Sequence, residues 1–305
     1  MFPFKDIVSA LSHIKGGIPL QRLSTKIRYG VHPSIFLGPS YKFVGLREYD
    51  DQRDSQKMIV ESHYDPEDGV IFARKTVAER EVRIKFFADL SSSIDSGTDF
   101  IKRKMLLEAI GFVGITGARF QDPIGLSGFD NKIILDLPSR CGTNNFYHLL
   151  RTLYLFFNKN DENKKIKTRN TDFFVALDFI SRTLNKPHFI PFVSDFVGFD
   201  KVVSSRLLRY VASRHELMFI FLDDPTEILS AAGVGYLKRR DIETGKEIVI
   251  SRSRKKLEKI EEEIRERRTF LRNKLKRMGI YSVVIEPEKT SKRLHKFFIR
   301  RRKLI

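Results

Sequence analysis

Three short apolar segments, each followed by a stretch with helical periodicity, limit the folds open to this chain more than any other feature. The segments are residues 82–88, 189–193 and 217–222, and an acidic residue follows each within two positions. Runs of this length, with turn residues beside them, favour strands over buried helices. Apolar strands that alternate with helices form a parallel sheet whose two faces are both covered. We therefore predict an α/β fold built on a doubly wound, mostly parallel sheet.

The remaining segments extend this core at both ends. Residues 124–137 are typical of a β-hairpin, which gives the sheet one antiparallel edge strand. We expect a short helix and a small β-rich region over residues 1–78, and the core over residues 79–230. Residues 231–305 are expected to add a hairpin, a long charged helix, a last strand and a basic C-terminal helix. Helices are predicted over residues 99–114, 144–157, 172–184, 200–213 and 253–278.

The net charge of +18 is concentrated near the C-terminus. Residues 251–305 hold 20 Lys and Arg but only 7 Asp and Glu. A basic region attracts an acidic protein, an anionic membrane surface or nucleic acid, and we rank nucleic acid last. The single cysteine, Cys141, excludes an internal disulfide and a CxxC metal site. No apolar run reaches the roughly 18 residues of a membrane span, so we expect a cytoplasmic protein that can contact the inner membrane face.

A hydroxyl-rich loop after the first apolar strand carries the strongest sign of chemistry. Asp89, Ser91 and Ser93 alternate along this loop, so one carboxylate and two hydroxyls can turn toward one point. Thr143 is expected to add a third hydroxyl, and Asp195, after the next strand, to hold a coordinated water. Hard oxygen donors of this kind suit Mg²⁺, with Mn²⁺ or Ca²⁺ as substitutes. With few full charges on the ion, we expect an acidic partner to complete its coordination, and the site can be empty without that partner.

Other interpretations of these residues stay open. The loop at Asp89 can be a turn without metal, and Thr143 can simply open the next helix, where Thr is a favoured first residue. Asp223 and Asp224 are expected to form a turn rather than bind an ion. The chain has no Gly-x-Ser-x-Gly motif and no phosphate-binding Walker loop, which disfavours a serine hydrolase or an ATPase. A metal-dependent nuclease or phosphodiesterase, or a nucleic-acid-binding protein, is the alternative.

A set of short motifs in a fixed order links the chain to a known family. The motifs are Gly45-Leu46-Arg47-Glu48-Tyr49, Glu79-Arg80-Glu81, Asp89 to Ser93, Gly142-Thr143, Ser194-Asp195-Phe196, Arg214-His215-Glu216 and Leu294 to Arg302. Together they resemble the bacterial MoxR-associated family, catalogued as domain of unknown function 58. The Trp-containing stretch usual in that family has no counterpart at residues 51–60.

The resemblance implies a von Willebrand factor A-like, Rossmann-like fold with a metal-ion-dependent adhesion site. In this sequence that site would comprise Asp89, Ser91, Ser93, Thr143 and Asp195. It further implies a binding module without catalysis, which works with a MoxR-type AAA+ ATPase to assemble or activate other protein complexes.

Overall fold

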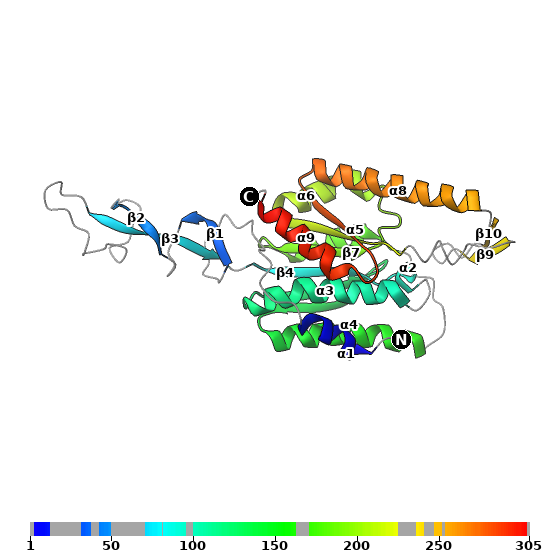
Figure 1. Cartoon of the computed structure of the whole chain (residues 1–305), viewed down its shortest axis with the longest axis horizontal. Helices are drawn as coiled ribbons and strands as arrows, with labels where there is room; N and C mark the ends of the chain where they lie inside the picture. The colour runs from blue at the N-terminus through cyan, green and yellow to red at the C-terminus, as the bar shows by residue number, and fades with distance from the viewer. Residues whose placement is uncertain are drawn as a thin grey trace. The chain divides into compact units, whose positions relative to one another are not determined.

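A computed structural model describes most of the chain (Figure 1). The described residues are 3–12, 32–37, 43–49, 71–80, 82–95, 100–162, 171–224, 236–240, 247–251 and 254–303. The chain divides into two compact units, one formed by residues 20–82 and the other by residues 1–19 with 83–305. Residues 51–60, where the family pattern is not kept, lie outside the described part of the chain.

The smaller unit is a three-stranded antiparallel sheet. Its strands are β1 (His32–Leu37), β2 (Phe43–Glu48) and β3 (Phe72–Arg80), with β3 in the middle. These three strands lie in and next to the region for which the sequence predicts β structure.

The larger unit is built on a six-stranded sheet in the order β11-β8-β7-β4-β5-β6. The strands are β4 (Ile84–Asp89), β5 (Ile124–Phe129), β6 (Ile133–Arg140), β7 (Phe189–Ser194), β8 (Glu216–Leu222) and β11 (Tyr281–Ile285). All neighbouring strands are parallel except β6, which pairs antiparallel with β5. The predicted mostly parallel sheet with one antiparallel edge strand is thus confirmed.

Helices cover both faces of this sheet, as Figure 1 shows. On one face α3 (Ile101–Arg119) contacts α1 (Phe4–Ser12), α4 (Thr143–Glu162) and α9 (Thr290–Lys303). On the other face lie α5 (Phe173–Thr183), α6 (Arg206–Arg214) and α8 (Arg254–Arg277), with the 3-10 turn η4 (Val202–Ser204) between α6 and α8. A one-turn helix, α2 (Ser92–Asp95), follows β4, and the hairpin of β9 (Tyr236–Arg240) and β10 (Glu247–Ser251) precedes α8.

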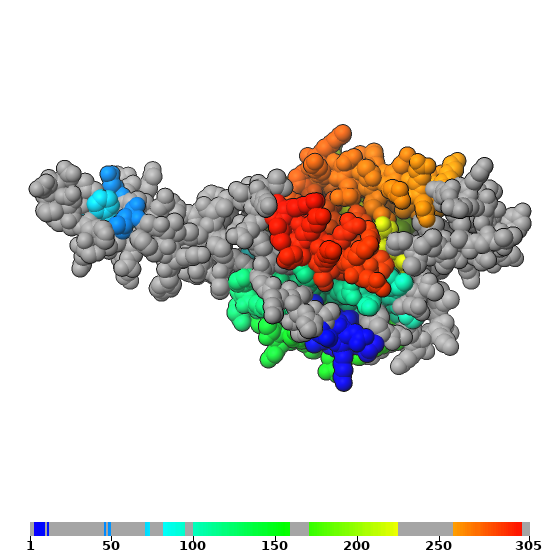
Figure 2. All heavy atoms as spheres, in the orientation of Figure 1, coloured from blue at the N-terminus to red at the C-terminus, as the bar shows by residue number. Residues whose placement is uncertain are grey.

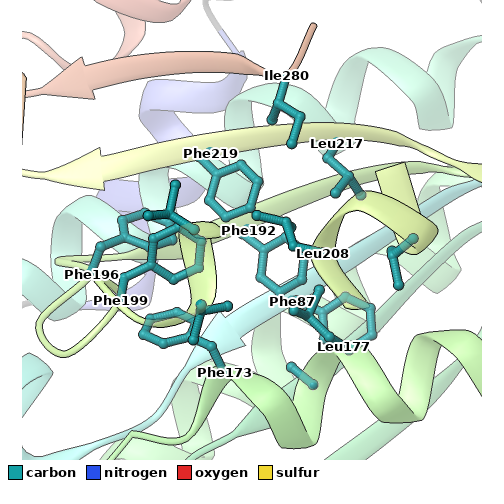
Figure 3. Close-up of a cluster of buried hydrophobic side chains, with 14 of the residues drawn as sticks. Phe87, Phe173, Leu177, Phe192, Phe196, Phe199, Leu208, Leu217, Phe219 and Ile280 are labelled. Carbon is teal, nitrogen blue, oxygen red and sulfur yellow. The ribbon is translucent and has the colours of Figure 1, made fainter. Parts of the chain in front are cut away.

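Phenylalanine dominates the core between the sheet and the α5–α6 layer (Figure 3). Phe192 of β7 stacks on Phe87 of β4 and on Phe219 of β8, with ring centroids 5.2 and 5.1 Å apart. Phe196 and Phe199, from the loop after β7, are buried in the same cluster. These two rings anchor that loop to the core, so the residues beside them have a fixed position.

The central helix α3 is longer than its sequence predicts, because it ends at Arg119 rather than near residue 114. Three glycines inside it, Gly111, Gly114 and Gly117, lower the intrinsic preference for helix. Each of them lies where a neighbour comes too close for a side chain: Leu11 of α1, Phe146 of α4 and Ile84 of β4, respectively. Packing therefore overrides propensity along this helix.

The first helix packs with the larger unit rather than with the β-rich region, with which it was grouped in the sequence. Ile7 and Leu11 are buried, and the ring of Phe4 lies 5.2 Å from that of Tyr154 on α4. In the space-filling view α9 (red) and α1 (blue) both contribute to the visible surface of this unit (Figure 2). Among the described residues, no helix has the length and apolar character that crossing a bilayer requires.

Candidate metal centre

The acids predicted to form the site meet at the carboxyl edge of the parallel sheet. Asp89 is the last residue of β4, and Ser194 is the last residue of the neighbouring strand β7. The pairing of Ala88 with Val193 places Asp89 and Ser194 side by side. In open α/β sheets, ligands gather at this edge.

Three donors surround the fully buried carboxylate of Asp89. Its Oδ1 accepts from the backbone N–H of Ser91 at 2.9 Å, and its Oδ2 accepts from the Ser194 hydroxyl at 2.5 Å. The Thr171 hydroxyl lies 3.3 Å from both oxygens and can donate to either. The carboxylate is therefore held in one orientation by groups from three separate loops.

The two serine hydroxyls of the loop are placed as adjacent ligands of one ion would be. Ser91 and Ser93 are both buried, and their Oγ atoms lie 2.9 Å apart. Two neighbouring oxygens bound to Mg²⁺ at 2.0–2.1 Å in octahedral geometry lie about 2.9 Å apart. The hydroxyl spacing fits a small, hard cation.

Asp195 is held by groups on both sides of its carboxylate. The backbone N–H of Val197 donates to its Oδ1 at 3.2 Å, and Lys102 Nζ of α3 donates to its Oδ2 at 3.1 Å. Lys102 also donates to the backbone carbonyl of Ser93 at 3.2 Å. With both oxygens engaged, Asp195 suits contact with a cation through a water better than direct coordination.

The loop that carries Asp195 is also fastened from the opposite helix layer. Arg267 of α8 donates to the Asp200 carboxylate at 2.6–3.1 Å and to the Phe196 carbonyl at 3.1 Å. The hydrogen bond with Arg267 is the main reason that the pKa of Asp200 lies below its usual value. The loop is thus restrained by α3 on one side and α8 on the other.

The surroundings of Asp89 penalise its negative charge. The pKa of Asp89 is raised to about 7, first by burial and then by the negative charge of Asp195, although hydrogen bonds from Ser194 and Ser91 lower it. Both raising effects penalise the carboxylate form, and a bound cation would relieve both. The donor set and its charge therefore fit a divalent metal ion.

Thr143 does not belong to this group, which corrects the sequence-based assignment. Strand β6 runs antiparallel to β5, and Arg140 pairs with Ile124 at the start of that strand. Thr143, the first residue of α4, therefore lies at the amino edge of the sheet, opposite Asp89. The six-residue strand β4 separates the two edges, a distance of roughly 17 Å at about 3.3 Å per residue.

Thr171 is the hydroxyl that sequence reasoning missed. It precedes Asp172, which caps α5 by accepting from the backbone N–H of Phe174, and the Asp172 N–H donates to the Asp130 carbonyl at 2.9 Å. Asp130 directly follows β5, so this contact ties Thr171 to the carboxyl edge. Only the length of α4 indicates this position of Thr171. A helix of 20 residues is about 30 Å long, which is enough to return the chain from the amino edge of the sheet to the carboxyl edge.

Among the described residues, no group of three or more His, Cys, Asp and Glu side chains is arranged to hold a metal ion. Asp223, which follows β8, does not enlarge the site, because it forms a two-point ion pair with Arg268 at 2.5 and 2.7 Å. Hydroxyls and few carboxylates suit Mg²⁺, Mn²⁺ or Ca²⁺ rather than Zn²⁺.

Similar proteins have been identified by sequence and by structure. Uncharacterized proteins of Mycobacterium bovis and Mycobacterium tuberculosis are each 25% identical over 227 residues, which cover 72% of this chain and 66% of theirs. This chain thus matches slightly less than two thirds of the length of these relatives.

Two solved structures are also similar. The protein BatB from Bacteroides thetaiotaomicron has 12% identity and a TM-score of 0.40, covering 73% of this chain and 99% of that one. An aerotolerance-related membrane protein from Bacteroides fragilis has 13% identity and a TM-score of 0.43, covering 73% and 100%.

The family described as "Protein of unknown function DUF58" matches residues 67–270, more than half of the chain. The matched range includes Asp89, Ser91, Ser93, Thr171 and Asp195. The chain therefore belongs to the DUF58 family.

Proposed function

We propose that this protein binds a divalent cation, Mg²⁺ in the cell, at the carboxyl edge of its sheet and uses it to hold an acidic partner protein. The observation that carries the proposal is a chain of buried hydroxyls at Asp89: the Ser91 and Thr171 hydroxyls contact its carboxylate, and the Ser93 hydroxyl contacts that of Ser91. Asp89 and these hydroxyls would hold the ion, with Asp195 acting through a water. The sheet order, with its one antiparallel edge strand, supports a von Willebrand factor A-like domain.

The same donor set supports binding without catalysis. Two-metal hydrolysis of phosphodiesters needs several carboxylates around a metal pair. Here one carboxylate faces the hydroxyls directly, and Asp195 is engaged by Lys102 and Val197. The bound ion would keep open positions and enough charge to accept a carboxylate from another protein. Cleavage of labelled DNA or RNA with Mn²⁺, abolished by Asp195→Asn, would instead support the nuclease alternative.

The first test compares two threonines at opposite edges of the sheet. Calorimetric titration of Mn²⁺ should give a measurable dissociation constant for the wild type and no binding for Asp89→Ala. Thr171→Ala should weaken binding about tenfold, because it removes one donor, whereas Thr143→Ala should leave it unchanged. Equal affinities in all four proteins, or a loss that follows Thr143 instead of Thr171, would contradict the assignment.

The partner side of the proposal is a MoxR-type AAA+ ATPase acting in the assembly or activation of a protein complex. It rests on the ordered motifs of the sequence and on the absence of a phosphate-binding loop in this chain. We expect copurification with such an ATPase in Mg²⁺, and loss of the complex with Asp89→Ala or with chelator.

Helix α9 exposes Lys292, Arg293, Lys296 and Arg300 toward solvent, which suits contact with an anionic membrane surface.

A further inference from the structure

A lysine ammonium already lies within the proposed metal centre. Lys102, in the first turn of α3, is 4% exposed and donates to the Asp195 carboxylate and to the Ser93 carbonyl. It forms a buried ion pair in which the Asp195 side chain is 7% exposed. Both acceptors belong to the loops that would surround the metal ion.

Helix formation does not explain a lysine at this position. The first turn of a helix carries a partial positive charge, so acids are favoured there and cations are disfavoured. Lysine is also almost never fully buried unless it is paired. The placement of Lys102 is therefore set by the two loops that it contacts.

The consequence is a matter of charge. With Asp89 ionised, as cation binding requires, Asp89 and Asp195 carry two negative charges and Lys102 carries one positive charge, so these three side chains sum to about −1. A dication brings this to about +1, whereas the same ion without Lys102 would give a neutral site. We propose that Lys102 keeps the metal-loaded site positive, so that it retains an anionic ligand at the expense of cation affinity.

This inference rests on the proposed function, because it assumes a cation at Asp89. It deepens that function by assigning the ligand class: a carboxylate or similar anion, in preference to a neutral oxygen donor. It also assigns the preference to one residue that would not itself touch the ion. Lys102 is thus a specificity-determining residue that acts through charge.

The test measures two affinities that should change in opposite directions. Lys102→Met removes the charge with nearly the same shape, and Lys102→Gln removes the charge but keeps a hydrogen-bond donor. Both variants should bind Mn²⁺ at least about tenfold more tightly by calorimetry at low salt, because the site without metal becomes more negative. Both should bind acetate at least about tenfold more weakly when loaded with Mn²⁺, measured by paramagnetic broadening of the acetate methyl resonance.

The control is Lys104→Met, which removes a lysine from the same turn that is 47% exposed and lies 4.0 Å from Glu108. It should change both affinities by less than about twofold. Unchanged or weaker Mn²⁺ binding by either Lys102 variant, or a change seen with Met but not with Gln, would overturn the inference. Folding is checked by circular dichroism, and Lys102→Gln alone decides the question if Lys102→Met does not fold. Failure of the wild type to bind Mn²⁺ would refute the proposed function itself, and this inference with it.

Discussion

His215, at the start of β8, shows how one buried residue can set the response of the protein to acid. Neither of its ring nitrogens has a hydrogen-bond partner within the described residues, and the ring of His188 lies 5.9 Å away. Burial is the main reason that the pKa of His215 falls to about 4, with His188 and Arg214 lowering it further. Between pH 6.5 and pH 4 the unfolded chain binds a proton here that the folded chain does not, so stability falls as the pH falls.

We predict that replacing this histidine removes part of the acid sensitivity. Between pH 7.5 and pH 5 the wild type should lose about 2 kcal/mol more unfolding free energy than His215→Leu. Urea unfolding at the two pH values measures the difference. His295→Leu, at an exposed position of α9, should lose as much as the wild type. The same loss in His215→Leu would show that other groups cause the acid sensitivity.

At this scale the sequence predicts some site residues and misses others for a physical reason. Asp89, Ser91, Ser93 and Asp195 follow apolar strands directly, so a local pattern places them at one edge of the sheet. Thr171 follows a long helix and a polar stretch of sequence, and its position depends on where that helix ends. No pattern within a few residues of it carries that information.

At the level of elements, the antiparallel strand β6 explains why Thr143 was assigned incorrectly. The hairpin over residues 124–137 was predicted correctly, and a hairpin necessarily returns the chain to the edge from which it started. Residues after β6 therefore begin α4 at the amino edge. The Gly142-Thr143 motif suggested a position near Asp89, but the direction of β6 places Thr143 at the opposite edge of the sheet.

The glycines of α3 give a prediction about packing. Gly114→Ala should lower the unfolding free energy by about 1–3 kcal/mol, because its Cβ would overlap the buried ring of Phe146. Gly111→Ala should cost less, because its Cβ would meet only the end of the Leu11 side chain at 2.9 Å, and alanine favours helix. Chemical denaturation of the two variants compares them directly. Equal losses would mean that helix propensity, rather than contact with α4, decides the effect.

On the scale of the whole molecule, the chain leaves the larger unit after α1 and returns to it at β4. Residues 20–82 form a compact unit of their own, while Ile7 and Leu11 of α1 remain buried in the larger one. The sequence predicted the β-rich region but not this interruption, since α1 carries no local sign of the distant helix on which it packs.

We therefore expect the larger unit to fold and bind metal without the β-rich unit. Replacing residues 20–82 with a flexible Gly-Ser linker should leave cooperative unfolding and the Mn²⁺ affinity within about twofold of the wild type. The physical reason is that Asp89, Thr171, Asp195 and Lys102 all belong to the larger unit. Circular dichroism and calorimetry measure the two properties, and loss of Mn²⁺ binding in a folded variant would mean that residues 20–82 support the site.

The loop after β7 is fastened by Lys102 from one helix layer and by Arg267 from the other. The sheet separates these two layers, so this loop contacts helices on both faces of the sheet. Replacing Lys102 or Arg267 would therefore remove one of two supports of the same loop, each from a different face of the sheet.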